Sequence, residues 1–549
     1  MYLNSNPWIF GDEYIYISKA RNLKFGIDVL ADTTIGHSYP PLYSYLLSLV
    51  IGNDPVSTYR NIQILNFFSS QFILLISFYF LNKTYDFTKQ KNGFVYLIFS
   101  YFGIASLSTI LGYNFVAMSE NLFIPLVFLI FSLTNYLLSK NKINYKLLFS
   151  IALLISCSIL TRTIGIILIP VFLLSMLPSF IKSKNTKKIF LDSVLFLFFS
   201  IIPYLIFKKV ENLFTPSTIQ EISGDYDSLF KAYVGVIKDF FLGKNNFFIS
   251  LKVIGNHIIY LFFSTFFLPF LFIINDFVEF VKSKKIKGEL IFVLTSSLLF
   301  FIPSYLHDYL GFFRNEIKYS TYFRYADASI IIMIAYSLIR LFEVTKNKLK
   351  IYKNSYFLYF FISMILTLFL PVRDFYVTIN SLGWTWLDIF KQNALIIKII
   401  SLLLLSIFLF FIKYKKYNLF LLSIIILNLF SIFPILKMNT WLSTNKENLA
   451  LEHTISNILS NNKKIPFYID KNNTKDDSFV GPIYYGKYFL LFNSNEKIPI
   501  KPINIKELNG KKQFVFLGKS KDDIFNIYNF NEVISISENL KIGIIYENK

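Results

Sequence analysis

Charged residues are scarce in this sequence of 549 residues: 16% are Asp, Glu, Lys or Arg, whereas 54% are hydrophobic. A soluble chain needs more charge than this to cover its surface. Cys157 is the only cysteine, which excludes a scaffold held together by disulfides. Aromatic residues make up 19% of the chain, which excludes a disordered protein. The composition therefore predicts a polytopic α-helical membrane protein.

The sequence contains many long apolar runs. A helix needs about 20 mostly apolar residues to cross the hydrocarbon core of a bilayer. Twelve stretches of the sequence predict such spans, at 61–81, 93–112, 121–138, 147–161, 164–181, 189–207, 252–275, 289–304, 323–341, 355–372, 392–412 and 418–436.

The net charge of +21 would suit a nucleic-acid partner, but the lysines are concentrated in alternate connections between the predicted spans. By the positive-inside rule these connections are cytoplasmic. The charge is thereby explained as a topology signal, and we predict no nucleic-acid partner. The six lysine-rich connections are 82–92, 139–146, 182–188, 276–288, 342–354 and 413–417.

This alternation places residues 1–60 and everything after residue 436 outside the cell, in a multi-pass protein of the plasma membrane. Because no apolar span precedes the outer segment 1–60, we predict that an upstream helix is missing, which would make thirteen spans. Residues 437–549 are polar with short apolar runs between turn clusters. They predict a small extracytoplasmic α/β domain after a transmembrane domain of residues 1–436.

Arginine is rare and lies mostly on the predicted outer side, in contrast to lysine. Its planar guanidinium bonds two phosphate oxygens at once, which makes it well suited to a phosphate site. As a set, the outer arginines favour such a site, although scattered contacts with lipid headgroups would also account for them. The outer arginines are Arg21, Arg60, Arg162, Arg314, Arg324 and Arg373, and Arg340 alone is predicted to be cytoplasmic.

The first outer segment carries an acidic pair, Asp12-Glu13, and later the stretch Tyr39-Pro40-Pro41-Leu42. Neighbouring residues on a helix differ by roughly 100°, so the two carboxylates cannot face one site. One is expected to be functional and the other structural. Alone, Asp12 after Gly11 would also suit a helix N-cap.

The order of these pieces resembles that of the membrane-embedded GT-C glycosyltransferases, above all the members related to protein O-mannosyltransferases and aminoarabinose transferases. Three later motifs match the same pattern: Ser119-Glu120-Asn121 at the start of a span, Thr161-Arg162-Thr163 in a short outer turn, and Phe323-Arg324-Tyr325 before a span. Tyr39 stands where some relatives have lysine, and no proline follows Arg324-Tyr325 closely, which leaves the donor sugar and the subfamily open.

The resemblance implies an enzyme that moves a sugar from a polyprenyl-phosphate donor to a protein, lipid or glycan acceptor on the outer face. Asp12 would be the base, with Glu13 or Glu120 as the alternative carboxylates. The resemblance also implies roles for a larger set: Arg21, Arg162, Arg324 and Tyr325 would bind the donor phosphate, and Tyr16, His37, Tyr39 and Pro40 would line the donor or acceptor pocket.

No cofactor is implied with certainty. Some GT-C members use a divalent cation, so magnesium or manganese could be held by Asp12 and Glu120. Plain structural roles compete with these assignments, since Glu120 would also suit the first turn of a helix and Arg324-Tyr325 an interfacial anchor. The rival functions are a flippase or transporter of lipid-linked sugars, a polysaccharide polymerase or ligase, and a membrane assembly protein without catalysis.

Overall fold

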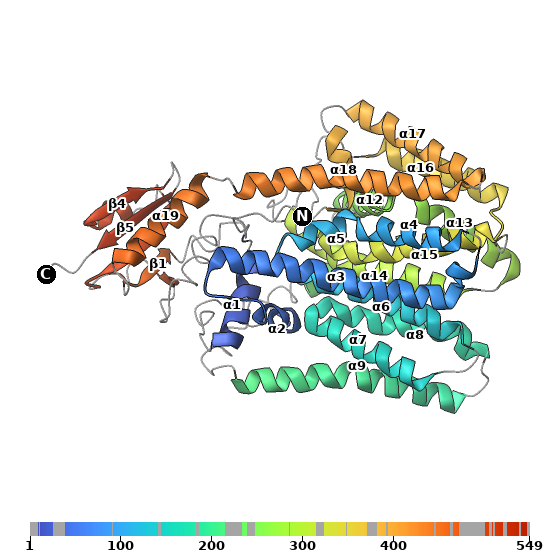
Figure 1. Ribbon diagram of the computed structural model, residues 1–549, viewed down its shortest axis with the longest axis horizontal. Coiled ribbons are helices and arrows are strands. Elements are labelled where there is room, and N and C mark those ends of the chain that lie inside the picture. Colours follow the sequence, from blue (N-terminus) through green and yellow to red (C-terminus); the bar gives the residue numbers. More distant parts are fainter. Residues whose placement is uncertain are drawn as a thin grey trace.

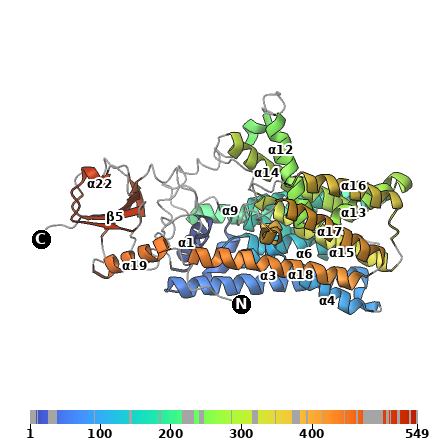
Figure 2. The same cartoon turned by 90° about the horizontal axis from the view of Figure 1, so that it is seen from above.

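Backbone groups inside a bilayer find no water to bond with, so the apolar runs of this chain must satisfy their own N–H and C=O groups as helices. A computed structural model shows these helices side by side in one bundle, with a small sheet beyond one end of it (Figure 1). A second view, turned by 90°, also has the sheet beyond the end of the bundle (Figure 2). The structure describes residues 9, 11–25, 39–90, 92–140, 144–182, 186–214, 233–238, 247–284, 286–313, 323–346, 349–370, 382–390, 394–414, 416–443, 446–461, 465–470, 500–503, 508, 511–519, 524–536 and 540–545.

The first half of the bundle consists of α1 (Gly11–Phe25), α2 (Leu42–Ser48), α3 (Pro55–Tyr85), the 3-10 turn η3 (Phe87–Lys89), α4 (Gly93–Ala105), α5 (Ser108–Asn114), α6 (Glu120–Leu138), α7 (Tyr145–Thr161), η4 (Thr163–Ile167), α8 (Leu168–Lys182) and α9 (Thr186–Phe214). The second half consists of α12 (Phe247–Ser264), α13 (Leu268–Ser283), α14 (Gly288–Phe313), η5 (Arg324–Ala326), α15 (Asp327–Thr345), α16 (Lys353–Leu368), η7 (Leu382–Phe390), α17 (Ala394–Lys413) and α18 (Tyr417–Ser443).

The prediction of twelve spans is confirmed only in part. Seven of the described helices are long and apolar enough to cross a membrane, and the bent pair α4 and α5 would make an eighth. Three further apolar helices are shorter: Tyr145–Thr161, Thr163–Ser179 and Leu191–Ile206. The protein is thus a multi-pass helical membrane protein, and its described residues contain seven or eight candidate spans, whereas hydropathy along the whole sequence predicts twelve.

Two predicted spans are broken. The stretch 93–112 bends by 54° between α4 and α5. The stretch 252–275 divides into α12 and α13, because Phe266 and Phe267 adopt the left-handed conformation, with φ of 53° and 66°. Pro269 then lies in the first turn of α13, where a proline begins a helix without losing a hydrogen bond. Hydropathy alone does not reveal these breaks, since the residues around them are apolar.

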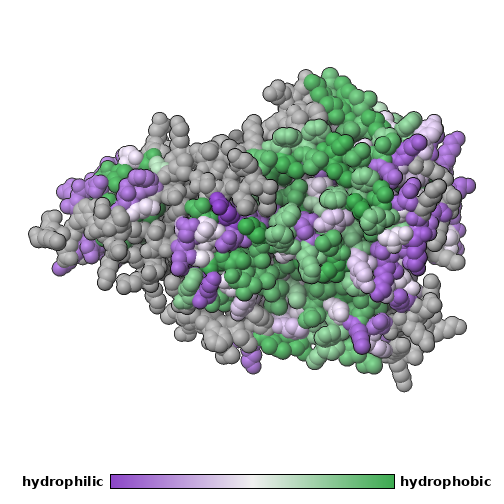
Figure 3. Space-filling view, viewed as in Figure 1, coloured by the Kyte–Doolittle hydropathy of each residue, from purple (hydrophilic) through white to green (hydrophobic). Residues whose placement is uncertain are grey.

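The helix ends that flank the lysine-rich connections lie together at the end of the bundle that is away from the sheet (Figure 1). Lys346 donates a hydrogen bond to the carbonyl of Tyr85, and Lys282 lies 3.8 Å from the ring centre of Tyr352. Polar side chains colour this end in the space-filling view, whereas apolar ones cover much of the bundle beside it (Figure 3). The shared end fits the alternation that the lysines predict, and which side of the membrane it faces stays a prediction.

Beyond the bundle, α19 (Lys446–Asn461) precedes a five-stranded mixed sheet. The strands, in the spatial order β2-β1-β3-β5-β4, are β2 (Ile500–Ile503), β1 (Phe467–Asp470), β3 (Phe514–Lys519), β5 (Leu540–Ile545) and β4 (Glu532–Ser535), with a short helix α22 (Ile524–Ile527). Alternate residues of β3 face opposite sides, so Val515 and Leu517 share a core with α19, whereas Phe514 and Phe516 pack with α22. Three of the four short apolar runs of the sequence after residue 436, at 465–469, 513–517 and 542–546, overlap β1, β3 and β5, and the fourth, at 484–492, lies outside the described residues.

Arg340 holds three helices together at the lysine-rich end. Its guanidinium forms ion pairs with Asp276 of α13 at 2.8 Å, with Glu289 of α14 at 3.0 Å and with Glu343 of α15 at 2.7 Å. Tyr336 also donates to Asp276. A guanidinium with no exposed surface is costly beside a membrane unless it is paired in this way.

We expect Arg340→Met to lower the free energy of unfolding by about 3–5 kcal/mol, because it leaves buried carboxylates without a partner. Thermal melting of the purified protein would measure this. Adding Asp276→Asn to Arg340→Met removes the most buried of these carboxylates and is expected to restore part of the loss. An unchanged melting temperature in Arg340→Met would contradict the role given to this cluster.

Candidate active site

The two acids of the first turn of α1 take separate roles, as their helical spacing predicts. Asp12 forms an ion pair with Nη1 of Arg324 at 2.7 Å and accepts a hydrogen bond from the Tyr39 hydroxyl at 2.7 Å. Glu13 is fully buried and accepts from the Tyr59 hydroxyl and from the backbone N–H of Ala117. Glu13 thus fastens α1 to α3 and to the segment before α6, and Asp12 alone joins the arginine cluster.

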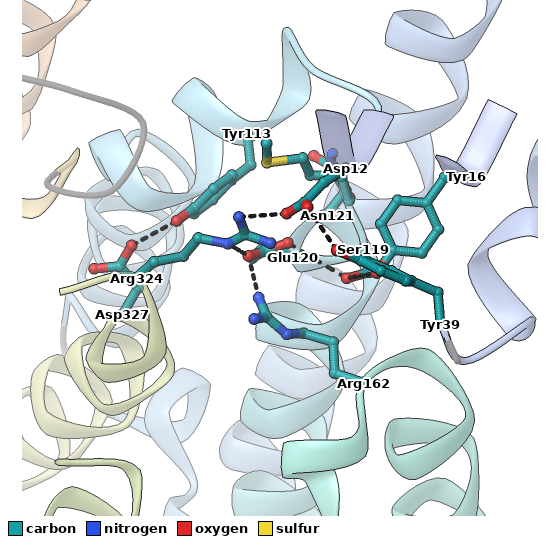
Figure 4. A network of polar contacts seen from close by, with 11 residues as sticks. Asp12, Tyr16, Tyr39, Tyr113, Ser119, Glu120, Asn121, Arg162, Arg324 and Asp327 are labelled. Atoms are coloured by element: carbon teal, nitrogen blue, oxygen red, sulfur yellow. Dashed lines mark hydrogen bonds and ion pairs between the residues drawn. The ribbon is translucent and has the colours of Figure 1, made fainter. Parts of the chain in front are cut away.

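Glu120 lies at the centre of that cluster (Figure 4). It is the first residue of α6, and one of its carboxylate oxygens pairs with both Arg162 and Arg324. Arg162 comes from the extended residue between α7 and η4, and Arg324 from the turn η5 that begins α15. Chain segments more than 200 residues apart therefore bring two guanidinium groups onto one carboxylate.

Gly165 makes possible the short turn that carries Arg162. A Cβ atom at this position would lie 2.6 Å from the backbone carbon of Ser158, closer than packed atoms approach. The Arg162 carbonyl accepts a hydrogen bond from the N–H of Gly165, and the Arg162 N–H donates to the Ser158 carbonyl. The turn is thus tight enough to place Arg162 against Glu120.

The stretch around Tyr39 closes the site from the side of α2. The two prolines, Pro40 and Pro41, directly precede α2, and Lys19 of α1 donates to the Tyr39 carbonyl at 3.0 Å. Tyr16 packs edge-on against Tyr39, and its hydroxyl donates to Ser119, next to Glu120. The structure therefore places Tyr16 and Tyr39 at the cluster, with Pro40 next to Tyr39 in the chain.

Tyr325 and Arg162 are in contact as well. The guanidinium of Arg162 lies 5.1 Å from the ring centre of Tyr325, within the range of a cation–π interaction. Arg21 is placed differently, at the far end of α1, where it donates to the carbonyl of Gly52 and lies over Phe25. These contacts lie away from the cluster, so the structure does not bring Arg21 together with the other two arginines, as a shared phosphate role would require. His37 lies outside the described residues.

The electrostatics of the site favour ionised carboxylates. Burial of Asp12 disfavours its charge, but the neighbouring Arg324, the Tyr39 hydroxyl and Arg162 outweigh this effect and hold the pKa of Asp12 below its usual value. Of the paired groups, Asp12 is also the most accessible: its side chain is 15% exposed, compared with 1% for Glu120. A reacting molecule could therefore reach Asp12 more readily than Glu120.

Sequence reasoning missed a further buried acid beside the cluster. Asp327, the first residue of α15, accepts hydrogen bonds from the hydroxyls of Tyr113 and Tyr260 at 2.8 Å and 2.5 Å. Tyr260 also stacks on Phe323, the residue before Arg324, with ring centres 4.2 Å apart. These contacts fix the turn from which Arg324 extends. The only sequence signal for Asp327 is its position in the first turn of a helix. Many surface helices have an acid there, so this signal does not select Asp327.

The arrangement does not fit the divalent cation that Asp12 and Glu120 could have held. Arg324 bridges these two carboxylates, so a guanidinium occupies the position between them. Among the described residues, no three His, Cys, Asp or Glu side chains gather closely enough to hold a metal ion. The charges that balance the carboxylates here are those of arginines.

The protein is therefore a multi-pass helical membrane protein with a buried cluster of carboxylates and arginines at one end of its bundle. No known protein family matches the sequence, and no curated protein matches it.

Two solved structures match almost the whole chain. The crystal structure of ArnT from Cupriavidus metallidurans in the apo state has a TM-score of 0.53 at 9% identity, covering 99% of this chain and 94% of the other. The structure of ArnT from the same organism bound to undecaprenyl phosphate has a TM-score of 0.52 at 10% identity, covering 99% and 95%. The chain therefore has the fold of ArnT, an aminoarabinose transferase of GT-C type, and the resemblance is confirmed at the level of the fold.

The pairing of Asp12 predicts a pH dependence. A carboxyl whose pKa is lowered by folding stabilises the native state above its unfolded pKa, here about 3.8, and this contribution is lost as the pH falls through the folded value. We expect Asp12→Asn to melt below the wild type at pH 7, and the gap to close as the pH falls below about 4. Melting curves of both proteins from pH 7 to pH 3 test this; a gap that stays constant would contradict it.

Proposed function

We propose that this protein is a membrane glycosyltransferase that moves a sugar from a polyprenyl-phosphate donor to an acceptor. The observation that carries the proposal is the pairing of Arg162 and Arg324 on Glu120, with Asp12 as the accessible carboxylate beside them. The ArnT-like fold supports it, because one of the matching ArnT structures is bound to undecaprenyl phosphate.

In the proposed reaction, the phosphate of the donor binds to Arg162 and Arg324, which exchange part of their contact with the carboxylates for contact with the phosphate oxygens. The bond between the anomeric carbon and the phosphate oxygen then breaks. Both arginines stabilise the charge that builds up on the leaving phosphate. As an acceptor hydroxyl or amine forms its bond to the anomeric carbon, Asp12 takes the proton that the acceptor loses.

The supporting roles follow from the contacts. Tyr39 orients the Asp12 carboxylate through its hydroxyl, and Tyr325 packs against Arg162. Glu120 keeps both arginines in place when no donor is bound. Tyr16 and Pro40 are proposed to line the pocket near Tyr39. Glu13 is proposed as a structural residue, since its partners hold α1 in position.

We place the site on the outer face of the plasma membrane, opposite the lysine-rich end, by the positive-inside rule. On this proposal residues 1–436 are the transmembrane glycosyltransferase domain, and residues 437–549 form an extracytoplasmic domain. The donor then enters from within the bilayer, and the acceptor arrives from outside.

The test of the base is sugar transfer in purified membranes supplied with a panel of radiolabelled polyprenyl-phosphate sugars. We expect Asp12→Asn to lower the rate by about 100- to 10,000-fold, as removal of a general base does. Asp86→Asn makes the same chemical change in an exposed residue that caps the C-terminal end of α3. It is therefore a matched control and should keep full activity.

Three other outcomes would revise the proposal. Activity that survives in Asp12→Asn at equal expression would move the base to another residue. Movement of the donor across the bilayer without cleavage would favour a flippase. No transfer from any donor, to acceptors of the protein, lipid and glycan classes, would argue against the enzyme.

The phosphate site has a separate test. Arg162→Lys keeps the charge but loses the planar fork, so we expect the KM for the donor to rise about tenfold to a hundredfold. Arg60→Lys makes the same change at an exposed position on α3 and should leave the KM unchanged. Steady-state kinetics of the three proteins would decide, and an unaltered KM in Arg162→Lys would remove this residue from the donor site.

A further inference from the structure

A polar cavity lies at the lysine-rich end of the bundle, far from the cluster of Asp12 and Glu120. Its volume is about 420 Å³, and its walls come from the start of α4, the end of α15 and the start of α18. α15 runs from the Arg324 turn to Thr345, so the two sites are about 30 Å apart along this helix. The proposed glycosyl transfer makes no use of this cavity.

Two lysines give the cavity a positive charge. Lys346 lies at its wall, where its ammonium donates to the carbonyl of Tyr85 at 2.8 Å and lies 4.3 Å from the ring centre of Phe342. Lys416, from the connection before α18, also lines the cavity and is exposed to solvent. None of the described residues that line the cavity is an aspartate or glutamate.

Two helices also begin at this cavity. Gly93 starts α4 and Tyr417 starts α18, and both residues line it. The N-terminus of a helix carries partial positive charge, which attracts anions. At α4 the N–H of Gly93 itself is already bonded to the carbonyl of Gln90, so its contribution is this charge. Gly93 is required here, since a Cβ atom would lie 1.8 Å from the carbonyl oxygen of Phe87.

We propose that this cavity binds a phosphate group, carried either by the headgroup of an anionic lipid or by a soluble phosphate. The two lysines supply the charge, and the starts of α4 and α18 supply the positive ends of two helix dipoles. The aromatic rings of Tyr96 and Phe342 form the apolar part of the wall, as at the boundary between headgroups and acyl chains.

The test uses the purified full chain in detergent with two probes. Phosphatidylglycerol is titrated and the bound molecules are counted by native mass spectrometry, with phosphatidylcholine as the lipid of zero net charge. Radiolabelled inorganic phosphate is measured by equilibrium dialysis. In the variant Lys346→Gln/Lys416→Gln we expect weaker binding by about fivefold for each lysine, in keeping with the attraction of a single lysine to an anionic surface.

Two further variants separate the site from general charge and from folding. Lys89→Gln/Lys413→Gln removes two exposed lysines at the same end that do not line the cavity, and should leave binding unchanged. Asn418→Asp places a negative charge at an exposed position of the wall without touching the lysine contacts, and should weaken binding as the lysine variant does.

The outcomes divide as follows. If the cavity variants bind phosphatidylglycerol more weakly and the control pair does not, the site is supported and its ligand is a lipid headgroup. If instead the cavity variants bind inorganic phosphate more weakly, the site is supported and its ligand is a soluble phosphate. The proposal is overturned if neither probe binds, if the cavity variants bind both probes as the wild type does, or if the control pair weakens binding equally.

Discussion

The ion pairs of Arg324 join three helices that lie far apart in the sequence. A charge buried within the span of a membrane is expensive, and it becomes tolerable only when an opposite charge meets it with good geometry. Arg324 meets Asp12 of α1 and Glu120 of α6, and Glu120 in turn meets Arg162. Since α6 and α15 are the most buried of the candidate spans, this cluster fastens the ends of the two central helices to α1, whose buried residues pack into the same core.

The same pairs suit the cluster to an anionic ligand. The two guanidinium groups are already largely removed from water by their contacts with carboxylates. When a phosphate replaces a carboxylate, these guanidinium groups therefore lose little further hydration. Under the proposed function, Arg324 would turn from Asp12 to the donor phosphate. The pKa of Asp12, which Arg324 helps to hold low, would then rise towards its usual value. Binding of the donor would thereby make Asp12 a stronger base at the moment when a base is needed.

Much of this cluster could be predicted from the sequence. The angle of roughly 100° between neighbouring helical residues is enough to assign Asp12 and Glu13 to different surroundings. Arg162 could be chosen because an arginine between two short apolar helices needs a partner. The argument from outer arginines also selects Arg21, because it applies to every arginine near a predicted outer end. Only the packing of α1 decides that Arg21 contacts Gly52 instead.

Asp327 shows why the rest of the site could not be predicted from the sequence. An acid in the first turn of an apolar helix is what the helix dipole favours on any protein surface, so its local pattern carries no functional signal. Its role arises from Tyr113 and Tyr260, which are 214 and 67 residues away. The break between α12 and α13 could not be predicted for the same reason. Phe266 and Phe267 adopt the left-handed conformation within an apolar run, so the local sequence carries no signal for the break. Hydropathy measures how well each residue tolerates lipid, whereas the path of the backbone depends on which side chains meet across the bundle.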